Sequence, residues 1–142
     1  MEPTPEMLLL SVLIVDDCVD TATSLAELLR FWGCATWTAA NGAEALRLFE
    51  TYLPDVVILD IRMPGMNGWE LARRLRSGPK PPLLVAVTGC GQEEDRHRSD
   101  ESGIHLHLIK PVDPAVLVAV LRRFDRVLTP AACEPLRPSQ SR

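Results

Sequence analysis

The sequence predicts an α/β fold in which helices cover both faces of a five-stranded parallel sheet. Short apolar runs such as DVVILD and LLVAVT do not alternate with polar residues, which is typical of strands buried on both faces. Longer segments with apolar residues at helical spacing separate these runs, and such alternation favours parallel strands joined by right-handed crossovers. A length of 142 residues suits one domain with a substantial core.

The predicted elements form five strand–helix units. The strands are expected near residues 11–16, 34–39, 55–60, 83–88 and 104–109. The helices are expected near 19–32, directly after Asn41, and near 67–76, 92–102 and 113–127. Gly33 and Gly103 stand as stop signals after two helices, and Asn41 and Asp113 stand as caps before two others. We expect a flexible leader at 1–10 and a disordered, Pro/Ser/Arg-rich tail at 128–142.

The strand order follows from the number of strands. Five parallel strands commonly adopt the flavodoxin-like, doubly wound (βα)5 order 2-1-3-4-5. Strand 34–39 then lies at an edge, and it is the one strand that does not end in a charged or catalytic-type residue. The four contiguous strands end at Asp16-Asp17, Asp60, Thr88 and Lys110. Parallel strands place their carboxyl ends at one edge, where open α/β sheets bind ligands, so we expect these side chains to share one crevice.

These residue types together suit phosphoryl transfer. Carboxylates a few ångströms apart repel, so Asp16, Asp17 and Asp60 are expected to bind a cation, and Mg²⁺ prefers such oxygen ligands. Lys110, one of two lysines, supplies a compact positive charge, and the Thr88 hydroxyl can donate to an anionic oxygen. An aspartate nucleophile would form an acyl phosphate. Taken singly, each residue has another explanation, such as a helix cap or a turn residue.

Composition and charge narrow the classes of function. A formal net charge of −4 argues against nucleic acid or a membrane surface as the main partner. No apolar stretch reaches the ~18 residues of a membrane-spanning helix, and the start has acids where a secretory signal has bases. The cytoplasm is therefore the expected compartment. The cysteines lack zinc-type spacing and are expected to be unpaired: Cys18, Cys34, Cys90 and Cys133.

Four segments resemble the receiver domain of two-component response regulators: LIVDDCVD, VVILDIRMPGMNGWELARRLR, AVTGCG and HLIKPVD. The resemblance covers residues 11–127. It implies a signalling switch, not an enzyme with turnover, in which Asp60 accepts a phosphoryl group from a histidine kinase or a histidine phosphotransfer protein. It also implies a set of Mg²⁺ ligands: Asp16, Asp17, Asp60 and the backbone carbonyl of Arg62.

The resemblance implies further roles around the acceptor. Lys110 would pair with the phosphoryl group, Thr88 would be the switch hydroxyl, and Lys110–Pro111 would be a cis peptide bond. Three residues match the turn after the acceptor, where glycine supplies unusual backbone angles: Pro64, Gly65 and Gly68. Phosphorylation would shift the population of the face around the fourth helix, fifth strand and fifth helix, which includes His107, Val112 and Val116.

Three positions depart from the family pattern or vary within it. His107 stands where the switch ring is usually Tyr or Phe, and it either titrates near neutral pH or packs as a ring against the neighbouring strand. Arg62 and Cys90 flank the phosphoryl position, where Arg62 would shield the anion, pair with it or point to solvent. His97 and His105 are expected at the surface or in helix packing.

The sequence leaves the downstream partner open. A stand-alone receiver, the receiver of a hybrid sensor kinase and a homodimer that forms on phosphorylation are all compatible with the resemblance. Other functions are also open. A Mg²⁺-dependent aspartyl-phosphate phosphohydrolase usually has a second acid where this chain has Arg62. A flavodoxin-like electron carrier would share the fold, but three clustered acids would repel a flavin phosphate. A degenerate receiver would act as a constitutive protein-binding module.

Overall fold

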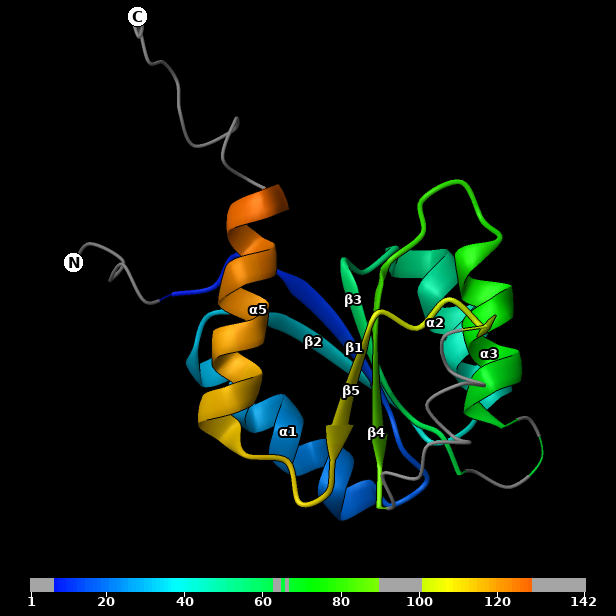
Figure 1. The fold of residues 1–142 in the computed structure, drawn as a ribbon, viewed down its shortest axis with the longest axis horizontal. Helices are drawn as coiled ribbons and strands as arrows, with labels where there is room; N and C mark the ends of the chain where they lie inside the picture. Colours follow the sequence, from blue (N-terminus) through cyan, green and yellow to red (C-terminus); the bar gives the residue numbers. More distant parts are fainter. Residues whose placement is uncertain (1–6, 63–64, 66, 90–100, 129–142) are drawn as a thin grey trace, which may run out of the picture.

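The computed structural model of the protein describes residues 7–62, 65, 67–89 and 101–128. At its centre lies a five-stranded parallel sheet with the order β2-β1-β3-β4-β5 (Figure 1). The strands are β1 (Ser11–Val15), β2 (Ala35–Ala39), β3 (Val56–Asp60), β4 (Leu83–Thr88) and β5 (Leu106–Ile109). The helices of the described residues are α1 (Val19–Phe31), α2 (Gly42–Tyr52), α3 (Gly68–Arg76) and α5 (Pro114–Leu128). The predicted fold class and strand order are confirmed.

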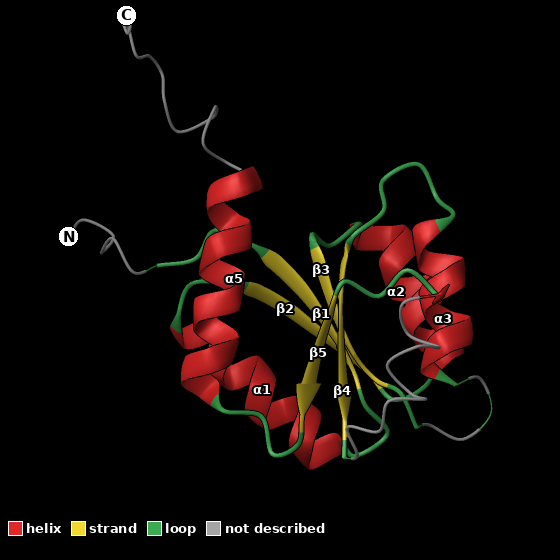
Figure 2. Ribbon diagram, in the orientation of Figure 1, coloured by secondary structure: helices red, strands yellow, loops and turns green. Residues whose placement is uncertain are grey.

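The sheet separates two apolar cores. Helices α1 and α5 cover one face, and α2 and α3 cover the other (Figure 2). Successive side chains of a strand point to opposite faces, so Leu13 and Val15 of β1 join the core under α2 and α3. Val12 and Ile14 join the core under α1 and α5. In the central strands β1 and β3, all residues but the first of β1 are buried, so polar side chains of these strands are placed at their carboxyl ends.

Side-chain caps explain where most of these helices begin. Side-chain oxygens accept hydrogen bonds from the first-turn N–H groups of three helices: Asn41 from Glu44 (2.8 Å), Asn67 from Glu70 (2.9 Å) and Asp113 from Ala115 (2.9 Å). Helix α1 differs, because its N-cap is Cys18, whose side chain makes no capping hydrogen bond. Asp16 and Asp17 therefore precede α1 without being its N-cap, which removes the helix-cap explanation for these two acids.

The chain packs from an earlier point than the predicted boundary at residue 11. Leu8 and Leu10 lie in the core under α1 and α5 and are 0% and 3% exposed. The Leu8 N–H donates to the carbonyl oxygen of Trp32 at 2.7 Å, at the end of α1. Residues 7–10 of the expected leader thus belong to the packed domain.

The start of β5 also differs from the prediction, because the strand begins at Leu106 instead of residue 104. Before it, the His105 N–H donates to the Leu84 carbonyl (2.9 Å), and the Leu84 N–H donates to His105 Nδ1 (3.0 Å). The His105 ring, expected at the surface, is exposed but also completes the pairing with β4.

Some predictions fall outside the described residues. These are nearly all of the helix expected at 92–102, the tail from 129 onward, and the residues Pro64, Cys90, His97 and Cys133. None of the helices in the described part of the chain is long and apolar enough to cross a membrane.

Candidate functional site

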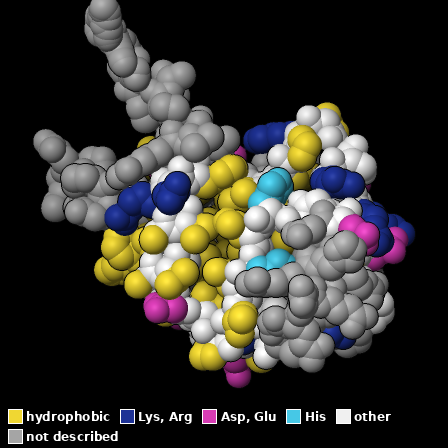
Figure 3. Space-filling model, in the orientation of Figure 1, with side chains coloured by type: hydrophobic (Ala, Val, Ile, Leu, Met, Phe, Trp, Pro, Cys, Tyr) yellow, Lys and Arg dark blue, Asp and Glu magenta, His cyan; other side chains and the backbone are white. Residues whose placement is uncertain are grey.

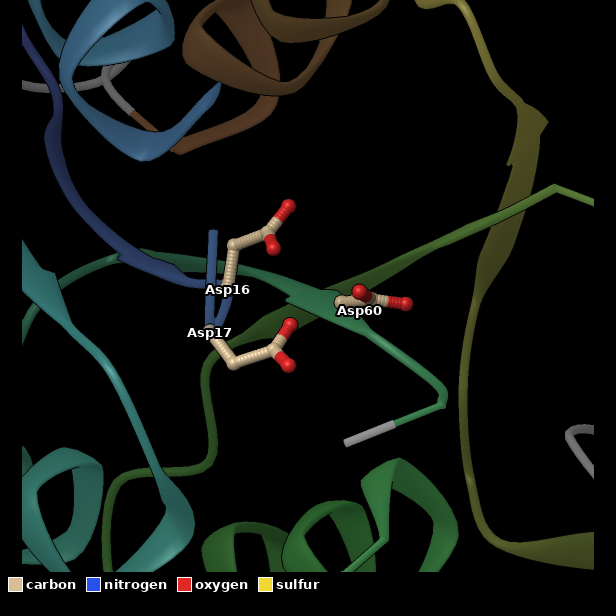
Figure 4. Close-up of side chains that lie close together, drawn as sticks. All are labelled: Asp16, Asp17 and Asp60. Carbon is tan, nitrogen blue, oxygen red and sulfur yellow. The ribbon is translucent and has the colours of Figure 1, made fainter. Parts of the chain in front are cut away.

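Polar side chains from four strand ends meet at the carboxyl edge of the sheet. Asp16 and Asp17 follow β1, Asp60 is the last residue of β3, Thr88 is the last residue of β4, and Lys110 follows β5. Oxygen atoms of Asp16, Asp17 and Asp60 lie within 4.8 Å of one another (Figure 4). The structure therefore brings the three predicted acids into one cluster.

Lys110 bridges the two buried carboxylates of this cluster. Its Nζ lies 3.2 Å from Asp60 Oδ2 and 3.4 Å from Asp16 Oδ2. The Lys110 N–H donates to the Thr88 carbonyl oxygen at 2.8 Å, which holds the lysine backbone against the end of β4. The peptide bond between Lys110 and Pro111 is cis. The hydrogen bond to the end of β4 thus places the Lys110 backbone at the edge of the sheet from which its side chain reaches the carboxylates.

The second oxygen of each buried carboxylate is bonded to the backbone. The Cys18 N–H donates to Asp16 Oδ1 at 2.9 Å, and the Arg62 N–H donates to Asp60 Oδ1 at 3.1 Å. Asp16 and Asp60 are only 5% and 7% exposed, whereas Asp17 is exposed. Each buried carboxylate is therefore oriented by one backbone N–H and by the shared lysine.

The electrostatics of the cluster favour an additional cation. Burial raises the pKa of Asp60, and the net shift stays upward although the Arg62 N–H and the Lys110 charge lower it. For Lys110, burial lowers the pKa, but the carboxylates of Asp60 and Asp16 outweigh burial and raise it. The pKa values of Asp60 and Lys110 can both be raised because one ammonium group is shared between two carboxylates. The ammonium gains from both of them but cannot neutralise both. Three carboxylates against one lysine leave an excess of negative charge, which suits a hard divalent cation such as Mg²⁺.

Two glycines shape the turn between β3 and α3, for different reasons. Gly65 has φ +80°, a backbone conformation that L side chains rarely adopt. Gly68 begins α3 and donates its N–H to the Ile61 carbonyl at 2.9 Å. A Cβ at Gly68 would lie 2.7 Å from Ile61 Cα and 3.0 Å from the Asp60 carbonyl oxygen. Gly68 is thus required for close approach of the helix to Asp60, and not, as predicted, for an unusual backbone angle.

The two predicted switch residues occupy neighbouring strands. Thr88 is 1% exposed, at the end of β4. His107 of β5 pairs with Ala86 of β4 and is half-buried. The strand pairing places the His107 backbone beside β4, and the role of its ring stays a prediction.

Arg62 has a neighbour that the sequence did not identify. Its guanidinium carbon lies 5.6 Å from the ring centroid of Trp69, a buried residue in the first turn of α3. This distance is that of a cation–π interaction. The sequence does carry a signal for this contact, namely an aromatic residue directly after the glycine that begins α3 and a few residues from the acceptor. Trp69 gives the Arg62 side chain a position beside the site.

The cysteines near the site and the core are unpaired where they are described. Cys18 is exposed, and hydrogen bonds from Thr21 lower the pKa of its thiol. Cys34 is buried, and burial raises the pKa of its thiol to about 11. Neither forms a disulfide bond, as predicted.

Comparisons with known proteins agree with this geometry. Residues 12–122 match the model of the response regulator receiver domain. An uncharacterized 14.6 kDa protein of Leptolyngbya boryana is 38% identical over 125 residues, which cover 87% of this chain and 95% of that protein. A probable transcriptional regulator of Guillardia theta, ycf27, is 38% identical over 119 residues, covering 81% of this chain and 46% of the regulator.

A solved structure of chemotaxis protein CheY4 from Vibrio cholerae superposes with a TM-score of 0.78 at 29% identity, covering 81% of this chain and 98% of that one. The chain spans about half the length of the regulator from Guillardia theta. With five strands in the order 2-1-3-4-5 and a family match over most of its length, the chain belongs to the response regulator receiver domain family of two-component signalling.

Proposed function

We propose that this receiver accepts a phosphoryl group on Asp60 from a phosphohistidine of a kinase or phosphotransfer protein. An Asp60 carboxylate oxygen attacks phosphorus, the P–N bond breaks with its electrons on nitrogen, and the departing imidazole takes up a proton from solvent. The observation that carries this proposal is the position of Lys110 Nζ, 3.2 Å from Asp60 Oδ2 and 3.4 Å from Asp16 Oδ2. An ammonium group shared between these carboxylates lies where the charge of an incoming phosphoryl group would develop.

The remaining residues of the cluster have supporting roles. Asp16, Asp17, Asp60 and the backbone carbonyl of Arg62 would hold Mg²⁺, which when bound offsets the negative charge of phosphoryl oxygens. The raised pKa of Asp60 supports this role, because a second positive charge would favour the ionised, nucleophilic carboxylate. Lys110 pairs with the phosphoryl group after transfer.

Phosphorylation is then transmitted through β4 and β5. The Thr88 hydroxyl turns toward the phosphoryl oxygens, and the Lys110 N–H bond to the Thr88 carbonyl links that movement to β5. His107 and the half-exposed Val116 lie on the face that changes. This face binds a downstream protein or a second phosphorylated copy of the chain, and the change is a shift between two packings.

A phosphohydrolase is the main rival function. Enzymes of the aspartyl-phosphate type usually place a second acid two residues after the nucleophile, where it can act as general acid and base. Arg62 stands there, and its guanidinium group lies over Trp69. The chain therefore lacks the group that would catalyse hydrolysis of the acyl phosphate at that position, which favours the switch over the phosphohydrolase.

Phosphorylation of Asp60 can be tested with a small phosphodonor. Incubation with acetyl phosphate and Mg²⁺ is expected to add the mass of one phosphoryl group, which hydroxylamine or base removes because the product is an acyl phosphate. Asp60→Asn should abolish the adduct. Asp55→Asn, directly before the amino end of β3, should keep it and serves as the matched control.

Two outcomes would contradict the proposal. An unmodified wild-type protein, with Mg²⁺ binding shown by calorimetry, would favour a constitutive binding module. Sustained release of phosphate from many unrelated phosphoesters would favour the phosphohydrolase.

A further inference from the structure

An apolar trough of about 670 Å³ runs from the acceptor site along α1. Its floor is the sheet, through Ile14, Ile58 and Val87. One wall is a single flank of α1, and the opposite wall is the segment that joins β5 to α5. On the face shown in Figure 3, hydrophobic side chains gather between α5 and β5. A volume of this size lies within the ~300–1,000 Å³ typical of small-molecule sites.

The trough lies between α1 and the segment that leads into α5. Helix α5 begins at Pro114, and its buried residues start only at Leu117. Between Lys110 and the helix, the loop contributes Pro111 and the half-buried Val112 to the wall.

The flank of α1 that faces the trough is polar near the start of the helix and apolar farther along it. Thr21 and Ser24 line the trough first, followed by Leu25 and Leu28. Asp20 lies in the first turn of α1 and is exposed. A ligand in the trough would therefore have an apolar body against the leucines and a polar group near Asp20.

The charges around the trough select the sign of that polar group. Three carboxylates and one ammonium line it: Asp16, Asp20, Asp60 and Lys110. Lys110 forms ion pairs with Asp16 and Asp60. Among the carboxylates of the lining, Asp20 is therefore the one for which no ion pair with this lysine is observed. An anionic head group would meet excess negative charge, whereas an ammonium group would be attracted.

We propose that the trough binds a small amphipathic organic cation, with its apolar body on Ile14, Leu25 and Leu28 and its ammonium group beside Asp20. The hydroxyls of Thr21 and Ser24 lie on the same flank and can accept hydrogen bonds from the ammonium. This site is additional to phosphoryl acceptance on Asp60. Binding is measured without a phosphodonor, so its failure is separate from a failure of the proposed phosphorylation.

Three naphthalene compounds with the same body test the proposal: 1-naphthylmethylamine, 1-naphthylmethanol and 1-naphthoate. Each is titrated into the ¹⁵N-labelled full chain while amide chemical shifts are followed. The cation is expected to bind about tenfold more tightly than the anion, with the alcohol between them, because a partly exposed ion pair contributes up to about 1 kcal/mol. The shifts should concentrate at Ser24, Leu28 and Val112.

Variants on α1 provide matched controls. Asp20→Asn should weaken binding of the amine about fivefold and leave the alcohol unchanged. Ser24→Phe should obstruct the trough and weaken the binding of both the amine and the alcohol by about tenfold or more. Thr23→Phe, at the neighbouring exposed position that does not line the trough, should bind like the wild type.

Three results would overturn the proposal. These are equal binding of anion and cation, shifts that concentrate around the exposed Phe31 instead of the trough, and equal effects of Ser24→Phe and Thr23→Phe.

Discussion

Replacement of Lys110 by methionine tests how the carboxylate cluster is held together. The substitution keeps the apolar stem and removes the charge that lies 3.2 Å from Asp60 and 3.4 Å from Asp16. At an effective dielectric constant of about 20, each attraction at such a distance amounts to about 5 kcal/mol. The lysine side chain is 32% exposed and its own desolvation opposes the gain, so we expect a net loss in unfolding free energy of about 2–3 kcal/mol.

The other lysine of the chain is a matched control. Lys80 lies 3.7 Å from Asp55, and its side chain is 58% exposed. Such a surface pair contributes about 0–1 kcal/mol. Urea unfolding of Lys110→Met and Lys80→Met, followed by tryptophan fluorescence without Mg²⁺, should therefore separate the two variants clearly.

The pH dependence of the stability loss in Lys110→Met provides a second test of this electrostatic account. The pKa of Asp60 is raised by burial, so its ionised form lowers stability above that pKa, and this cost disappears as the pH falls through it. Without Lys110 that pKa rises further, so the loss in Lys110→Met should be largest near neutral pH and smaller in acid. Addition of Mg²⁺ should restore part of the stability. Equal losses in the two lysine variants, or a loss that acid does not reduce, would refute the electrostatic account.

Three further predictions concern the acceptor, the chain start and the turn. Asp60→Asn should raise the urea midpoint of the metal-free protein at neutral pH and remove the stabilisation by Mg²⁺, because the buried charge is gone. Leu8→Ala should cost about 2–5 kcal/mol in urea unfolding, whereas Leu9→Ala, at a position 68% exposed, should stay within about 0.5 kcal/mol. Gly68→Ala should lower stability by about 1–3 kcal/mol and slow acetyl phosphate labelling, since its Cβ would lie 2.7 Å from Ile61 Cα. Gly78→Ala, whose Cβ would lie 3.9 Å from the Leu75 carbonyl oxygen, an ordinary van der Waals contact, should do neither.

Much of the fold could be predicted because its signals are local. Buried strands between amphipathic helices are visible as short apolar runs, and chain order then restricts the sheet to few topologies. The predicted last residue of each strand is within one residue of the observed last residue. Asn41 and Asp113 accept first-turn hydrogen bonds as their residue types predict.

Features that depend on distant segments could not be predicted in the same way. Leu8 is buried because a neighbouring helix and strand leave room for it, and an apolar residue near a chain end carries no local sign of that. The His105 ring accepts a hydrogen bond from β4, 21 residues away. The contact of Arg62 with Trp69 depends on how the turn folds back on α3.

The sequence by itself determined which residues gather at the site, because in a parallel sheet the residue after each apolar run must lie at the carboxyl edge. Asp16, Asp17, Asp60 and Lys110 follow from that rule alone. Only the tertiary structure decided that one lysine bridges two buried carboxylates, and that an apolar trough extends from them along α1. These features depend on distances between segments that are close in space and far apart in the chain, and no local pattern of residue types specifies such distances.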